Sequence, residues 1–340
     1  MTTKLSLLVA STVASLLLLE GAVRWLLPYY APNRQIYFHA VPGEGIAVGL
    51  KSQTVRQRTP KGDYDLPIRF NAHGFRDVKD LRGSRNSDWF VLGDSYSMGW
   101  GVPEEQRFSN VLESYLATKG RNEQVFNIAI PEDILGYQHL LSYAERHGAK
   151  VHHLIVGICM ENDLRDYSDG QTAFERGRHG ATSGSNRQLL RSWLKQNSAL
   201  YLATSFSLQK VPFLRHLVEK VGLARNIHLL TGENEWNEEV LISSANKLVE
   251  LVSDRDALIL IIPSRRLWQG DSIPTEERVH AAFLRLLREA GLQVLDLKNP
   301  FESSGAPLAH YFLTDPHWNN LGHSVAGHEL FRAIHARRHE

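Results

Sequence analysis

The sequence predicts an α/β fold in which helices cover both faces of a mostly parallel sheet. Short apolar runs typical of buried strands alternate with segments whose apolar residues recur at helical spacing. The predicted strands are residues 88–93, 125–130, 151–159, 257–262 and 292–297. The predicted helices are residues 104–118, 135–146, 275–290 and 320–338. Strands separated by amphipathic helices indicate a three-layer α/β/α sandwich, because parallel strands need crossover connections that cover the sheet.

Composition narrows the function classes. The chain has 340 residues, enough for one large domain with insertions or for two small domains. Its formal net charge is +1, so the sequence lacks the excess of basic residues that is typical of nucleic-acid-binding proteins. Cys159 is the only cysteine, so no internal disulfide is possible, and its apolar surroundings predict a buried side chain. Neither a Gly-x-Gly-x-x-Gly fingerprint nor a Gly-Lys-Ser/Thr loop occurs, so we expect no dinucleotide or other cofactor.

The N-terminus has the length and polarity of a membrane anchor. After Lys4, residues 5–19 carry no charge, and a helix over residues 5–27 reaches the ~20 residues that span a bilayer. Glu20 and Arg24 are spaced to pair on this helix. A cleaved signal peptide is the alternative, but no Ala-x-Ala site follows the apolar run. An uncleaved single-pass anchor with its positive end in the cytoplasm would place the remaining chain outside it.

Three domains are predicted along the chain. They are the anchor at residues 1–30, an extended arm or small strand pair at residues 31–86, and the α/β domain at residues 87–340, with a helical insertion at about 165–240. Within the insertion, residues 170–186 are rich in Gly, Ser, Arg and Thr and predict a surface loop. In the arm, residues 71–77 predict a turn with Asn and Gly at its permissive positions.

A serine follows the first predicted strand of the sheet. Gly93 ends this apolar run and Ser95 comes two residues later, at the carboxyl end of the strand, where open α/β sheets bind their ligands. A serine at a strand-to-helix turn can act as a nucleophile, with backbone N–H groups nearby to hold an oxyanion. The alternative is an ordinary turn in which Asp94 and Ser95 serve as cap residues.

Later residues decide between these readings of Ser95. Asn162 follows another strand end, where its amide can donate to an oxyanion or cap the next helix. Gly136, after the second strand, is a candidate backbone donor. His317 precedes the last helix and can act as general base, with Asp315 fixing its tautomer. An Asp-Pro turn beside a fold-supporting histidine is the alternative for this pair.

A metal site at the same place is not predicted. Asp315, His317 and His323 are potential ligands, but a second ligand cluster of the usual spacing is absent from the sequence. Helix geometry also places His323 about a turn or more from the other two residues.

Three separated blocks resemble the SGNH (GDSL-type) hydrolase superfamily, in the order of that superfamily. They are Gly93-Asp94-Ser95, Gly157 with Asn162-Asp163, and Asp315-Pro316-His317-Trp318-Asn319. The resemblance covers most of residues 71–330 and implies an SGNH, flavodoxin-like sheet. It also implies Ser95 as nucleophile, His317 as general base, Asp315 as its orienting carboxylate, and Asn162 with the Ser95 backbone N–H as the oxyanion hole.

Two departures qualify the resemblance. A single residue, Pro316, separates Asp315 from His317, a spacing that resembles polysaccharide acetyltransferase relatives. Ala129 and Glu132 stand where the superfamily has glycines, so Gly136 is the remaining candidate for the third oxyanion donor.

These observations predict a membrane-anchored serine ester hydrolase or O-acyltransferase with its domain outside the cytoplasm. Its substrate would be an acylated carbohydrate, such as an acetylated cell-surface glycan, or another ester, and the anchor with the family association suggests polysaccharide-biosynthesis partners. Nothing in the residues chooses between water and a sugar hydroxyl as acceptor. The alternative from another class is a non-catalytic glycan-binding or polysaccharide-assembly protein on the same scaffold.

Overall fold

The centre of the protein is a parallel five-stranded sheet, seen in a computed structural model that describes residues 2–32, 35–59, 62–182, 186–210 and 237–337. The strand order is β6-β5-β7-β8-β9, and every neighbouring pair is parallel. The strands are β5 (Trp89–Gly93), β6 (Val125–Asn127), β7 (His153–Cys159), β8 (Asp256–Ile262) and β9 (Val294–Asp296). This is the flavodoxin-like order, and it places the strand that leads to Ser95 inside the sheet. The predicted fold class is confirmed.

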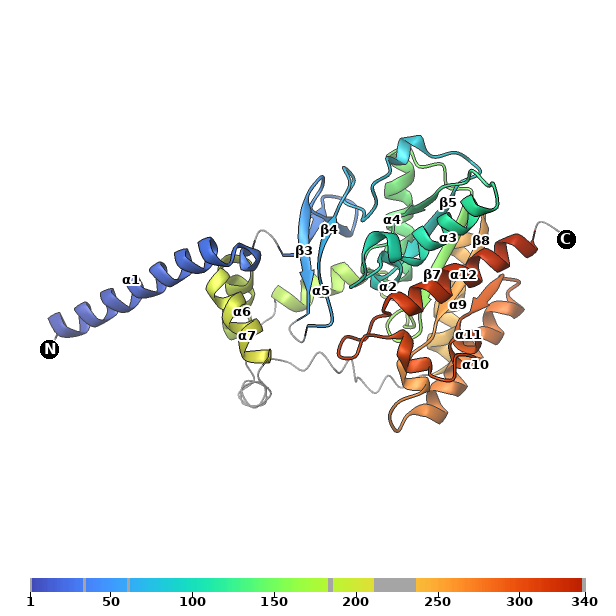
Figure 1. The fold of residues 1–340 in the computed structure, drawn as a ribbon. Coiled ribbons are helices and arrows are strands. Elements are labelled where there is room, and N and C mark those ends of the chain that lie inside the picture. Colours follow the sequence, from blue (N-terminus) through green and yellow to red (C-terminus); the bar gives the residue numbers. More distant parts are fainter. Residues whose placement is uncertain (1, 33–34, 60–61, 183–185, 211–236, 338–340) are drawn as a thin grey trace.

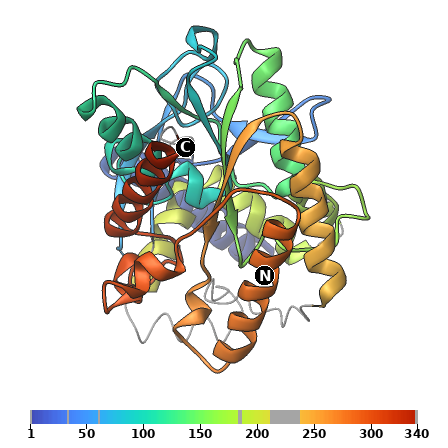
Figure 2. The same cartoon turned by 90° about the vertical axis from the view of Figure 1, so that its right-hand side faces the viewer.

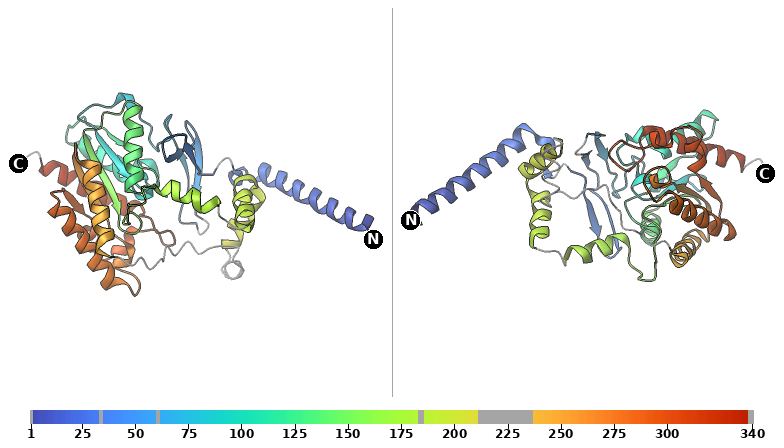
Figure 3. Two further views of the ribbon diagram at one scale, coloured as in Figure 1. Left: turned by 180° about the vertical axis from the view of Figure 1, so that it is seen from behind. Right: turned by 90° about the horizontal axis from the view of Figure 1, so that it is seen from below.

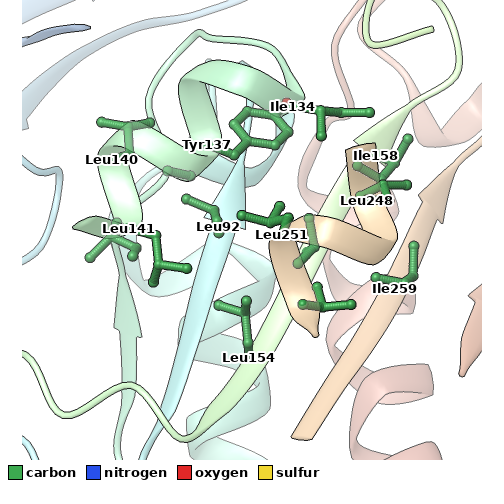
Figure 4. Packing of buried hydrophobic residues seen from close by; sticks show 14 of the residues in the cluster. Leu92, Ile134, Tyr137, Leu140, Leu141, Leu154, Ile158, Leu248, Leu251 and Ile259 are labelled. Atoms are coloured by element: carbon green, nitrogen blue, oxygen red, sulfur yellow. The ribbon is translucent and has the colours of Figure 1, made fainter. Parts of the chain in front are cut away.

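Helices cover both faces of the sheet (Figure 2). On one face lie α4 (Ile134–Arg146), α9 (Glu238–Val252) and α10 (Ile273–Glu289); on the other lie α3 (Phe108–Thr118), α11 (Lys298–Glu302) and α12 (Asn320–Ala336). Alternate strand residues supply the two cores. Phe90 and Leu92 of β5 pack in the cluster with α4 and α9, whereas Trp89 and Val91 pack in the cluster with α3 and α12. Figure 4 shows Leu92 of the first cluster among the side chains of α4 and α9.

The predicted helices of the sheet domain agree with the structure to within a few residues, but α9 was not foreseen. Its N-cap is Asn237, whose side chain accepts the Val240 N–H at 2.8 Å. The short helical elements are α2 (Ser95–Met98), η3 (Leu81–Gly83), η4 (Glu104–Gln106), η5 (Arg265–Leu267) and η6 (Pro307–His310).

Two antiparallel hairpins occupy the segment predicted as an extended arm or strand pair. They are β1 (Phe38–Val41) with β2 (Ile46–Gly49), and β3 (Thr54–Arg58) with β4 (Asp65–Arg69). After β4 comes the predicted turn, where the Asn71 side chain accepts the His73 and Phe75 N–H groups. Gly74 has a φ of 84°, and a Cβ there would lie 2.7 Å from the Gly49 carbonyl oxygen, so this turn requires glycine.

Three described helices lie in the predicted insertion, namely α5 (Ala173–Thr182), α6 (Asn186–Asn197) and α7 (Ala199–Lys210), while residues 211–236 lie outside the described part. The prediction of a surface loop at residues 170–186 was wrong because α5 occupies much of it. Thr172 and Glu175 form a capping box, in which Thr172 N–H donates to the Glu175 carboxylate at 3.0 Å and Glu175 N–H donates to Thr172 Oγ1 at 3.2 Å. This Thr-x-x-Glu signature was present in the sequence.

A long helix, α1 (Thr2–Leu26), projects from the rest of the molecule and leads into η1 (Pro28–Tyr30) (Figure 1). The segment Lys4–Leu26 has a mean hydropathy of 1.9 and is long enough to cross a membrane, a property that it shares with signal sequences. Helices α6 and α7 lie at the end of α1 nearest the domain (Figure 3). The predicted pairing of Glu20 and Arg24 is present, with Nε and Oε1 2.7 Å apart.

Candidate active site

Ser95 is the first residue of α2, directly after the turn that ends β5. Gly93 makes this turn with a φ of 149°, and a Cβ there would lie 2.8 Å from the Gly157 carbonyl oxygen on the neighbouring strand. Asp94 then caps α2 by accepting the Tyr96 N–H at 2.9 Å. The sequence thus leaves Ser95 half-buried at the carboxyl edge of the sheet, with its backbone N–H in the first turn of a helix, where such groups lack intrahelical partners.

The structure brings Ser95, His317 and Asp315 into one hydrogen-bonded chain. Ser95 Oγ lies 2.7 Å from His317 Nε2, although 222 residues separate them in sequence. His317 Nδ1 lies 2.6 Å from Asp315 Oδ1, and the His317 backbone N–H donates to the same oxygen at 3.0 Å. Because Asp315 is an acceptor at Nδ1, the neutral imidazole carries its proton there and presents a lone pair at Nε2 to the serine.

The loop that carries His317 is held from several sides. Arg265 donates to the carbonyl oxygens of Phe312 and Asp315 at 3.3 and 3.0 Å. Tyr96 donates its hydroxyl to the Pro316 carbonyl oxygen at 2.7 Å. Rings of Tyr96 and Trp100 flank the imidazole of His317, with centroid distances of 4.7 and 5.6 Å. These contacts fix the imidazole beside Ser95.

Asp315 has a second hydrogen-bond donor that the sequence did not indicate. Tyr64, at the turn between β3 and β4, donates its hydroxyl to Asp315 Oδ2 at 2.9 Å, and Trp100 Nε1 donates to the Tyr64 oxygen at 2.5 Å. Burial disfavours the charged form of Asp315, but the hydrogen bonds from His317 and Tyr64 outweigh it and hold the pKa of this carboxyl below its usual value. Asp315 therefore stays ionised at neutral pH.

Asn162 lies at the same edge of the sheet, directly after β7. Its side-chain Nδ2 donates to Asp94 Oδ2 at 3.1 Å. An amide nitrogen has two N–H groups, so one donor remains on this exposed side chain. Burial raises the pKa of Asp94, and burial together with the charge of Asp94 raises the pKa of Asp163. Asp94, the residue before Ser95, thus holds the candidate oxyanion amide of Asn162 at this edge of the sheet.

Gly136 does not offer a free donor in this structure. Its backbone N–H donates to Asp133 Oδ1 at 3.0 Å, where Asp133 is the N-cap of α4. A Cβ at Gly136 would also lie 2.7 Å from the Cβ of Glu132, so the Glu132 side chain covers this position. The cap of α4 therefore already uses the N–H group that the sequence suggested as an oxyanion donor.

His323 is separated from Asp315 and His317 by its place in the core. It is buried on α12, where its Nδ1 accepts the Phe108 N–H at 3.4 Å and its ring stacks on Phe108. Burial, with the nearby Arg76 and Arg107 charges, lowers its pKa to about 3, so it is neutral. No group of three or more His, Cys, Asp or Glu side chains suited to a metal ion occurs within the described residues.

Comparison with known proteins supports the predicted resemblance. Residues 247–340 match the family model described as an SGNH hydrolase-like domain, acetyltransferase AlgX. No curated protein matches the sequence. The resemblance to the SGNH hydrolases is therefore confirmed in the part of the chain that carries Asp315 and His317.

Solved structures of esterases and lipases are distantly similar. A lipase/acylhydrolase from Enterococcus faecalis is 12% identical with a TM-score of 0.44, over 74% of this chain and 96% of that chain. A catalytic mutant of Axe2, an acetylxylan esterase from Geobacillus stearothermophilus, is 11% identical with a TM-score of 0.42, over 74% and 96%.

Proposed function

We propose that this protein is a serine ester hydrolase or O-acyltransferase that works through an acyl-enzyme. The observation that carries the proposal is the continuous chain from Ser95 Oγ through both nitrogens of His317 to Asp315, with links of 2.7 and 2.6 Å. This is the arrangement that activates a serine hydroxyl at neutral pH.

In the proposed reaction, Ser95 Oγ attacks the carbonyl carbon of an ester while His317 Nε2 takes the hydroxyl proton. The resulting oxyanion accepts hydrogen bonds from the Ser95 backbone N–H and the free amide N–H of Asn162. When the tetrahedral intermediate collapses, the ester C–O bond breaks and His317 returns the proton to the leaving alcohol. Water or an acceptor hydroxyl then attacks the acyl-enzyme by the same steps in reverse.

For the substrate, we propose an acetyl or other acyl ester of a cell-surface glycan. Two features support this class. The matched family model is described as an acetyltransferase, and a single proline separates Asp315 from His317, as in the acetyltransferase-like spacing. Partners in polysaccharide biosynthesis belong to the same proposal.

We further propose that α1 is an uncleaved anchor with the catalytic domain on the extracytoplasmic side. Hydrogen bonds from Glu20 and Arg24 of α1 to residues 197–200 of the insertion support this; we call this contact the clasp. Glu20 accepts hydrogen bonds from Ser198 Oγ at 2.8 Å and from the backbone N–H groups of Ala199 and Leu200 at 2.9 Å each, so it caps α7. Arg24 donates to the Asn197 carbonyl oxygen at 2.7 Å. Cleavage after α1 would remove these partners from the folded protein.

To test the proposal, the rate at which the full chain in detergent hydrolyses a chromogenic acetyl ester is measured for wild type and for the Ser95→Ala variant. We expect wild-type turnover to fall by at least a thousandfold in the variant, because the nucleophile is lost. Adding a glycan acceptor separates the two activities, since acetyl on the glycan indicates transfer. Equal turnover by the two proteins would contradict the serine mechanism. Turnover by wild type no faster than the background without protein would favour the non-catalytic glycan-binding alternative.

A further inference from the structure

The β3–β4 hairpin lies outside the parallel sheet, yet its turn reaches the loop that carries Asp315 and His317. Asp63 accepts the Thr314 N–H at 3.1 Å and also accepts the Thr314 hydroxyl. On β3, the side chain of Gln57 accepts the Gly101 N–H at 2.9 Å. The hairpin therefore contacts two loops of the candidate site, the one after Ser95 and the one before α12.

Tyr64 makes the most direct of these contacts. Its side chain is buried, and its ring lies 5.1 Å from that of Phe312. Glycine at position 101 leaves room for it, because a Cβ there would lie 2.6 Å from the Tyr64 ring. Its hydroxyl donates to Asp315 and accepts from Trp100 Nε1. Both the position of the ring and the direction of the hydroxyl proton are thus fixed by the surrounding residues.

We propose that Tyr64 is a positioning residue of the active site. It would hold the carboxylate of Asp315 in the orientation in which Oδ1 faces His317 Nδ1. The proposal rests on the function proposed above. Asp315 Oδ1 receives the His317 Nδ1 and backbone N–H groups, while Oδ2 receives the Tyr64 hydroxyl. Without a donor on Oδ2 the carboxylate can rotate about its Cβ–Cγ bond, and the imidazole loses its fixed direction. A residue 251 positions away in sequence thereby supports the carboxylate of the triad.

The test uses Tyr64→Phe in the full chain, because phenylalanine keeps the ring packing and removes only the hydroxyl. The readout is the rate at which a fluorophosphonate probe captures Ser95, measured from pH 5 to pH 9. We expect capture at neutral pH to slow about tenfold, as for the loss of one hydrogen bond to a charged group. We also expect the acid limb of the profile to move to higher pH, because the Tyr64 hydrogen bond helps to hold the pKa of Asp315 low, and without it the carboxylate accepts a proton more readily.

Asp65→Asn is the matched control. It breaks the exposed 2.6 Å ion pair with Arg56 in the same hairpin without touching Asp315, so we expect wild-type capture and pH profile. A Tyr64→Phe protein that captures the probe at the wild-type rate with an unchanged profile would overturn the proposal. Equal slowing by both variants would also overturn it, because the hairpin would then act only through its overall stability.

A second readout does not depend on activity. We expect the proton between His317 Nδ1 and Asp315 to give a low-field proton resonance, because the two atoms are 2.6 Å apart. This resonance should disappear in Asp315→Asn and shift in Tyr64→Phe. If the probe does not react with Ser95 of wild type, the proposed serine mechanism is wrong. The resonance would still show whether the Tyr64 hydroxyl affects the hydrogen bond between Asp315 and His317. A low-field resonance identical in wild type and Tyr64→Phe would contradict the positioning role.

Discussion

Glu132 is a buried acid just before α4, at a position where the SGNH resemblance leads one to expect glycine. Its side chain covers Gly136 and accepts the Phe174 N–H at 3.2 Å. Burial, followed by the charge of Asp133, raises the pKa of Glu132 from 4.5 to about 8. The folded protein therefore holds a proton that the unfolded chain releases near pH 4.5.

This shift makes stability depend on pH. The stabilising effect of protonated Glu132 is complete below pH 4.5 and is lost as pH rises to about 8. At pH 8.5 the Tm of the Glu132→Gln variant should therefore exceed that of wild type by roughly 3–6 °C. This difference in Tm should shrink as the pH falls toward 4.5. Differential scanning calorimetry checks this, with exposed Glu105→Gln as control. A Tm difference that does not vary with pH would contradict the assignment.

Single residues show what the sequence could and could not predict about the site. Ser95, Asp315 and His317 were predictable because each stands in a short local motif at a strand or helix end. Tyr64 was not predictable, because its importance depends on a hairpin that packs against a loop 251 residues away. Gly136 was a plausible donor by position, but only the structure shows that the α4 cap already uses its N–H.

At the level of elements, periodicity predicted the sheet and most of its helices, because one buried face imposes a regular spacing. The α5 helix was missed because its composition is polar and its stability comes from partners. One is the capping box at its start, which is local and was present in the sequence as Thr-x-x-Glu. The other is Arg176, whose guanidinium lies 2.7 Å from the Asp133 carboxylate, 43 residues away in sequence. Side-chain partners distant in sequence cannot be read from local composition.

The clasp between α1 and α7 gives a prediction for an element. Glu20→Gln removes the charge that caps the positive N-terminal end of α7 and weakens the pair with Arg24. We expect the backbone amides at the start of α7, including Ala199 and Leu200, to exchange hydrogen about tenfold faster in the full chain in detergent. Hydrogen exchange with mass spectrometry measures this.

The control for this experiment is Glu250→Gln, which removes an exposed carboxylate that pairs with Lys247 on α9. It should leave exchange at the start of α7 as in wild type. If Glu20→Gln also leaves that exchange unchanged, the clasp does not stabilise α7, and the support it gives to an uncleaved α1 is withdrawn.

For the molecule as a whole, the segments outside the sheet connect α1 to the candidate site. The hairpins and the helices α5 to α7 lie between α1 and the sheet domain (Figures 1 and 3). The insertion clasps α1 through Glu20, and the β3–β4 hairpin contacts Asp315 through Tyr64.

The central claim is that Ser95 carries the acyl group during the reaction. The most direct measurement is to quench the full chain during turnover of an acetyl ester and locate acetyl by peptide mass spectrometry. We predict acetyl on Ser95, and none on its neighbour Ser97, whose side chain is buried. The adduct should be absent from Ser95→Ala. Turnover without acetyl on Ser95, or the same adduct in both proteins, would contradict this account.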